Sequence, residues 1–85
     1  MPLISMFFGI IITMNINDHP RPHLHAKYGE HKAVYLLDGT LDEGHLPRKQ
    51  DKLVQAWIAL HQDELEANWE ILHSEGEAFR IDPLR

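Results

Sequence analysis

The residues of this chain best suited to chemistry gather in one run, NDHPRPHLHAKYGEH, at positions 17–31. Four of the seven histidines lie there, together with acidic and basic side chains. Imidazole is a common metal ligand and titrates near neutral pH, so the run could form a metal site or an acid–base site. Polar side chains also form hydrogen bonds around turns and corners, and a purely structural role is the third interpretation.

Three side chains of this run alternate along a predicted strand. His23, His25 and Lys27 are each separated by one residue, and residues two apart on a strand point to the same side of a sheet. A histidine can act as general acid or general base, and a lysine can stabilise developing negative charge. We therefore take His23, His25 and Lys27 as the candidate catalytic residues.

The same histidines are the basis of a metal-binding alternative. His19 and Asp18 lie just across the proline corner and could join His23 and His25 around one ion. Such a set of imidazoles and a carboxylate suits zinc or another divalent transition metal. We expect no cofactor unless these four residues bind such a metal.

Basic side chains define a candidate anion-binding set. Arg21 lies in the proline corner, and Arg48 and Lys49 come at the start of a predicted helix, whose terminal N–H groups attract phosphate. The alternative is that solvent screens these exposed charges. The net charge of −5 argues against broad nucleic-acid binding, because contacts to phosphates need a basic face.

The elements that must position these residues begin with an alternating apolar run. Alternation between apolar and polar residues predicts a strand with one strongly apolar face. Because fourteen extended residues would span about 45 Å, we expect a bend or break at Gly9. The apolar parity of this run consists of Ile4, Met6, Phe8, Ile10, Ile12, Met14 and Ile16.

Two hairpins follow the proline corner. HLHAKY predicts a strand that ends at Gly29-Glu30, a pair suited to a type II′ turn because glycine accepts positive φ. HKAVYLLD predicts the return strand, and Asp38-Gly39 predicts a type I′ turn before a short strand, TLDE. Residues 3–43 therefore predict a four-stranded, mainly antiparallel sheet with the order of a meander.

From Pro47 onward the apolar spacing changes to that of a helix. Pro47 suits the first helical turn, and Gly76 suits a helix end. The segment is either one helix of about 28 residues or two helices broken near His61, and usual helix lengths favour two. We expect the tail residues Phe79 and Ile81 to join the core. The apolar stripe of the helical segment should pack on the apolar face of the first run. It consists of Leu53, Trp57, Ile58, Leu65 and Trp69.

The composition fits one α+β domain over residues 1–85, with a sheet over 3–43, a helical part over 47–75 and a tail over 76–85. At 44% hydrophobic and 25% charged residues, the chain is typical of globular proteins. The absence of cysteine fits a reducing cytoplasm. The uncharged N-terminal run is shorter than the roughly 18 apolar residues of a membrane span, so we expect a cytoplasmic protein without membrane contact.

Several motifs resemble those of one family. They are ISMFFGIIITM, NDHPRPHLHAKYGE, the pair Leu46-Pro47, Trp57, the pair Leu60-His61, and the pattern EL..NW at residues 64–69. On these motifs the chain resembles, over residues 3–83, a small bacterial family known as domain of unknown function 4160. The resemblance implies no settled activity. It implies a role like that of the small partners found in two-gene modules of the toxin–antitoxin type.

Three functions stand as hypotheses. The first is a partner-binding component of such a two-gene module, which associates with a small cognate protein or with itself, since association would stabilise a small core. The alternative is a toxin-like nuclease or another phosphodiester-acting enzyme that uses the histidine cluster. The second alternative is a histidine-based metal-binding domain.

Overall fold

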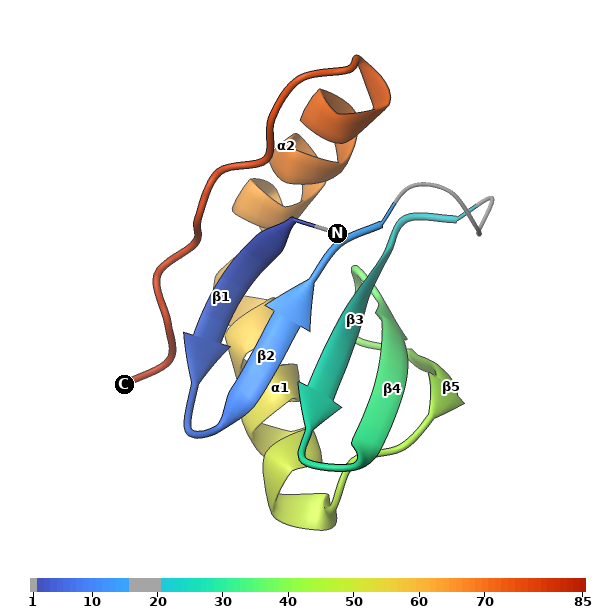
Figure 1. The fold of residues 1–85 in the computed structure, drawn as a ribbon, viewed down its shortest axis with the longest axis vertical. Coiled ribbons are helices and arrows are strands. Elements are labelled where there is room, and N and C mark those ends of the chain that lie inside the picture. Colours follow the sequence, from blue (N-terminus) through green and yellow to red (C-terminus); the bar gives the residue numbers. More distant parts are fainter. Residues whose placement is uncertain (1, 16–20) are drawn as a thin grey trace.

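The computed structural model describes residues 2–15 and 21–85, and within them five strands are followed by two helices (Figure 1). No helix in this part of the chain is long and apolar enough to cross a membrane. In chain order the elements are β1 (Leu3–Phe7), β2 (Ile10–Thr13), β3 (His23–Tyr28), β4 (His31–Leu36), β5 (Leu41–Gly44), α1 (Arg48–Leu60) and α2 (Gln62–His73).

The strands form one sheet in the order β1-β2-β3-β4-β5, and each strand is antiparallel to its neighbour. Figure 1 shows α1 behind the strands and α2 extending beyond the N-terminal end of β1, so the described helices leave the front face of the sheet open. The predicted α+β class, the antiparallel meander and the C-terminal helices are confirmed. The predicted number of four strands is wrong.

The additional strand results from a sharp turn at the predicted break. Phe8 and Gly9 both have positive φ, 50° and 80°, as a two-residue type I′ turn requires. The first apolar run therefore folds back on itself, and β1 pairs with β2. A single strand of about 45 Å would exceed the longest dimension of the domain, 34 Å. The break expected at Gly9 is confirmed.

The prediction of which side chains of the first apolar run face the core is wrong for the first half of that run. A bulge before Ser5 shifts the phase of β1 by one residue, so that Ser5 and Phe7 are buried together with Ile4. Met6 is 55% exposed, and Phe8 is 58% exposed in the turn. Beyond the turn the parity is confirmed for Ile10, Ile12 and Met14, which are buried, whereas Ile16 lies outside the described residues.

The two later turns agree with the prediction to different degrees. At Gly29-Glu30 only the glycine has positive φ, 57°, as a type II′ turn requires. At Asp38-Gly39 the predicted type I′ turn is wrong, because only Gly39 has positive φ, 97°. The Asp38 carboxylate accepts a hydrogen bond from the Thr40 N–H at 2.9 Å, and this bond lowers the pKa of Asp38. A longer loop, in which a type I turn precedes the left-handed glycine, is the result.

The helical segment forms two helices, which was the favoured alternative. α1 ends at Leu60 and α2 begins at Gln62, and the intervening His61 has a non-helical φ of −124°. The first helix starts one residue after Pro47. Leu53 is half-buried and packs against the core. The other members of the predicted helix stripe are buried, namely Trp57, Ile58, Leu65 and Trp69.

α2 ends close to Gly76, as predicted, but a different residue adopts the left-handed conformation that ends the helix. The Gly76 N–H donates to the Ile71 carbonyl at 2.8 Å, which is the hydrogen bond of a Schellman motif. The left-handed residue of this motif is Glu75, with φ of 62°. Gly76 is required for a different reason, because a Cβ atom there would lie only 2.8 Å from the Ile71 side chain.

The C-terminal tail runs beside β1 and covers that edge of the sheet (Figure 1). Ile81 is buried, as predicted, and its N–H donates to the Ile4 carbonyl at 2.9 Å. The prediction for Phe79 is wrong, since its side chain is 38% exposed. The backbone of Phe79 is the part that anchors the tail, because its N–H and carbonyl both bond to the buried Asn68 amide at 2.8 Å.

Candidate functional site

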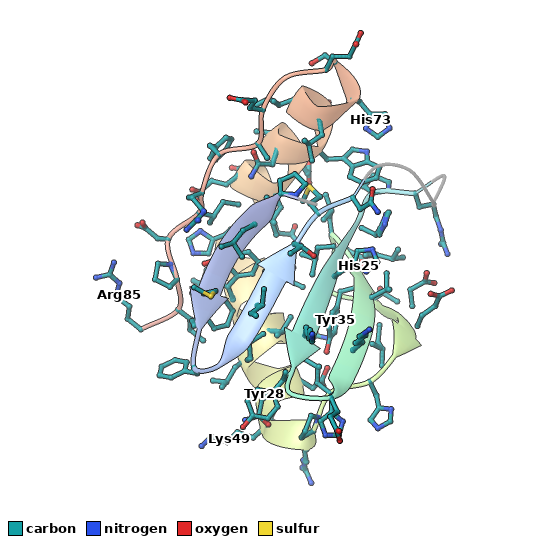
Figure 2. The ribbon with its side chains drawn as sticks, in the orientation of Figure 1. His25, Tyr28, Tyr35, Lys49, His73 and Arg85 are labelled. Atoms are coloured by element: carbon teal, nitrogen blue, oxygen red, sulfur yellow. The ribbon has the colours of Figure 1, made fainter. Side chains whose placement is uncertain are left out.

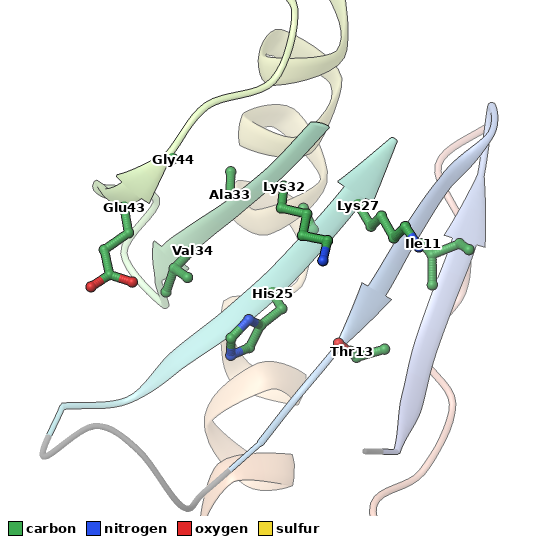
Figure 3. A pocket seen from close by; sticks show the side chains of 10 residues that line it. Ile11, Thr13, His25, Lys27, Lys32, Ala33, Val34, Glu43 and Gly44 are labelled. Atoms are coloured by element: carbon green, nitrogen blue, oxygen red, sulfur yellow. The ribbon is translucent and has the colours of Figure 1, made fainter. Parts of the chain in front are cut away.

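The open face of the sheet carries a groove of about 530 Å³ formed by β2, β3, β4 and β5 (Figure 3). We call it the sheet groove. It lies on the face turned away from the helices, and strand pairing arranges its side chains in two rows that cross the strands. The first row consists of Thr13, His25, Val34 and Glu43. The second row consists of Ile11, Lys27 and Lys32.

His25 is the predicted histidine that lines the sheet groove. It is half-buried in the first row, between Thr13 on β2 and Val34 on β4, and its ring is directed into the groove (Figure 3). The ring also meets that of His23 edge-on, with centroids 5.2 Å apart. His25 is therefore the histidine that a ligand in the groove would contact.

His23 has a different environment although it shares the same side of β3. The side chain is fully buried, and its ring stacks edge-on against Trp69 of α2 at 5.2 Å. Its Nδ1 lies 3.0 Å from the Arg21 carbonyl oxygen. Because a carbonyl only accepts, this nitrogen carries the hydrogen. His23 thus joins the end of β3 to α2 and does not line the sheet groove.

The two lysines of the groove face each other across the strands. Lys27 on β3 pairs directly with Lys32 on β4, and both side chains are exposed. Neither forms an ion pair within residues 2–15 and 21–85. Like charges opposite each other on an antiparallel pair repel, so this row concentrates positive charge beside the apolar Ile11.

The structure separates the three cations of the predicted anion-binding set. Arg21 precedes β3 and pairs with Asp42 at 3.5 Å, with its side chain 64% exposed. Arg48 and Lys49 lie at the start of α1, where they line a separate shallow hollow with Lys52. Figure 2 shows Lys49 at the Tyr28 end of the molecule, away from His25. These cations do not converge on one position in the described chain.

The predicted metal set is described only in part, since Asp18 and His19 lie outside the described residues. Within the described residues, no three histidine or acidic side chains are close enough together to hold an ion. His23 and His25 are in ring contact. The metal-binding alternative therefore stays a prediction.

Three further histidines do not line the sheet groove, namely His31, His45 and His61. The imidazoles of His31, at the start of β4, and His45, just after β5, lie near each other with ring centroids 6.1 Å apart, and both residues are exposed. His61 packs on Trp57 and pairs with Glu64 at the junction of the helices.

Two groove residues, Lys32 and Glu43, were missed by the sequence reasoning. A two-residue turn at Gly29-Glu30 fixes the pairing of Lys32 with Lys27, so Lys32 could have been identified from the predicted hairpin. Glu43 could not, because the loop before β5 differs from the predicted turn and a bulge also shifts the pairing of β5.

A partly buried hydrogen bond between Tyr35 and Asp51 holds β4 in place below the groove. Tyr35 lies on the helix-covered face, fully buried, and its hydroxyl donates to the Asp51 carboxylate of α1 at 2.6 Å. Burial first, and then the hydrogen bond to this carboxylate, raises the pKa of Tyr35 far above its usual value. The bond anchors the strand whose opposite side presents Lys32 and Val34 to the groove.

The fold and the groove define a small α+β protein whose antiparallel sheet has one helix-covered face and one open face. The chain belongs to the family called domain of unknown function DUF4160, whose model matches residues 9–70. The match includes every strand that lines the sheet groove, and the family assignment expected from the sequence motifs is confirmed. No curated protein and no solved structure matches the chain.

Proposed function

We propose that this chain is a partner-binding protein, the small component of a two-gene module of the toxin–antitoxin type, and that it binds a small cognate protein through the open face of its sheet. The observation that carries the proposal is the exposure of apolar side chains on that face. Met6 and Ile11 pair across β1 and β2, and they are 55% and 37% exposed.

Burial of such side chains by a partner would be favourable. A large apolar side chain contributes about 1.5–3 kcal/mol when it passes from full exposure to full burial, so Met6 and Ile11 together could contribute a substantial part of a specific association. A partner that binds only the folded state would also raise the stability of this chain, which at 85 residues buries a small core.

The proposal is tested by co-expression with the protein encoded beside this chain, followed by size-exclusion chromatography with light scattering. The variant Met6→Gln/Ile11→Thr should lose the complex, while Leu60→Gln should retain it. Leu60 is a matched control because it is 69% exposed but lies on α1. Equal complex formation by all three proteins would contradict the proposal, and a complex of two identical chains would identify self-association as the alternative.

A phosphodiester-acting enzyme is the second candidate, and one arrangement favours it. His25 lines the same groove as Lys27 and Lys32, so an acid–base group and two cations lie around one space. Purified protein should then cleave RNA, and His25→Gln should abolish the cleavage while leaving the thermal unfolding midpoint unchanged. RNA that stays intact with the wild-type protein would contradict this candidate.

A further inference from the structure

The row Ile11–Lys27–Lys32 is an unusual arrangement for a solvent-exposed sheet. Sheets normally place opposite charges or polar residues across from each other, and a directly opposed pair of lysines destabilises the hairpin. Within residues 2–15 and 21–85, neither lysine has an acidic partner in an ion pair. A bound anion would relieve this repulsion.

The geometry of the pair is suited to a single carboxylate. Directly opposed residues on antiparallel strands have Cβ atoms about 5 Å apart, so the ammonium groups of Lys27 and Lys32 can approach one anion from two sides. The neighbouring residue in the row, Ile11, is apolar and 37% exposed. A ligand that fits the row therefore has a negative group next to an apolar group.

We propose that the sheet groove binds an extended acidic segment of the partner protein, with a carboxylate between Lys27 and Lys32 and an apolar side chain against Ile11. This inference rests on the proposed partner-binding function and assigns the chemistry of the partner. Charge complementarity selects this occupant over others, because the positive charge is confined to one row.

A nucleic acid fits the groove less well than an acidic segment. Glu43 lines the other row of the same groove, and the whole chain has a net charge of −5. A polyanion would place further phosphates near these acidic groups, whereas one or two carboxylates need only the local pair of lysines.

The test uses two synthetic probes and amide chemical shifts of the full chain. The acidic probe is acetyl-Leu-Glu-Leu-Glu-Leu-amide, and the neutral probe contains glutamine in place of glutamate. The acidic probe should shift the amide signals of β2, β3 and β4, and its Kd should rise about tenfold in Lys27→Gln/Lys32→Gln. Lys52→Gln should bind as the wild type does, because Lys52 is exposed at the start of α1.

Weaker binding by Lys27→Gln/Lys32→Gln would not result from unfolding of the variant. Removal of two opposed like charges should leave its thermal unfolding midpoint unchanged or raise it. The inference is overturned if both probes bind equally, if neither binds, or if a uridine hexamer shifts these signals and the acidic probe does not. The last outcome would instead favour the second candidate function.

The outcomes also separate this inference from the proposed function. In one outcome, Lys27→Gln/Lys32→Gln still binds the cognate protein and Met6→Gln/Ile11→Thr does not. This outcome would refute the proposed binding of an acidic segment and would agree with the partner-binding function. Retention by both variants would refute the function itself.

Discussion

Along β3 the side chains alternate between two surfaces of different character. Leu24 and Ala26 are buried beneath the helices, whereas His25 is half-buried and Lys27 is exposed on the open face. Apolar burial on the first face provides most of the folding free energy. On the open face the opposed lysines and exposed apolar groups contribute little to stability, and the function proposed above assigns them to binding.

The largest effect should come from the covered face. Trp57→Ala removes a fully buried ring that packs on the Phe7 ring, with ring centroids 5.4 Å apart. The substitution should lower the free energy of unfolding by about 3–5 kcal/mol. Ile11→Ala on the open face should lower it by about 1 kcal/mol or less. Urea titrations followed by circular dichroism measure both, and equal losses would contradict the distinction between the faces.

The next effect concerns the tail that closes the edge beside β1. Asn68→Ala removes the amide that holds the Phe79 backbone by two hydrogen bonds, and it should cost about 1–3 kcal/mol. The same variant should make the tail accessible to carboxypeptidase. Glu66→Ala, at an exposed position of the same helix, is the control, and an Asn68→Ala protein with wild-type stability and tail protection would contradict the role of this amide.

A smaller effect should appear as a pH dependence. The folded state raises the pKa of Tyr35, so the stabilisation is complete below the unfolded value of about 10 and is lost as the pH rises above it. Tyr35→Phe should cost about 1 kcal/mol at pH 7 and should flatten the alkaline part of the stability curve. Tyr28→Phe is the matched control, and an unchanged curve in Tyr35→Phe would refute the prediction.

The smallest effect should be a gain on the open face. Lys32→Thr removes one of two directly opposed lysines, and it should raise the free energy of unfolding by about 0.2–0.5 kcal/mol. Because salt screens charges at the surface, the gain should shrink at 1 M salt. A loss of stability at low salt would show that Lys32 has a stabilising contact, which would weaken the charge argument for the groove.

Part of the candidate site could be predicted from the sequence because strand alternation is a local property. The spacing of His25 and Lys27 placed them on one side of a strand, and the short turn at Gly29-Glu30 implied the position of Lys32 opposite Lys27. The separation of His23 from the groove could not be predicted. It depends on Trp69, which lies 46 residues further along the chain and reaches His23 only through helix packing.

The sequence by itself determined the strands after the proline corner, a break at Gly9 and the helical segment, because hydrophobic periodicity and glycine backbone freedom act over a few residues. The tertiary structure alone decided the phase of β1, where the bulge before Ser5 turned Met6 outward. It also decided which of the two neighbouring histidines is buried. These features depend on pairing and packing between distant segments, and the free energy of those contacts is not encoded in any short stretch of the chain.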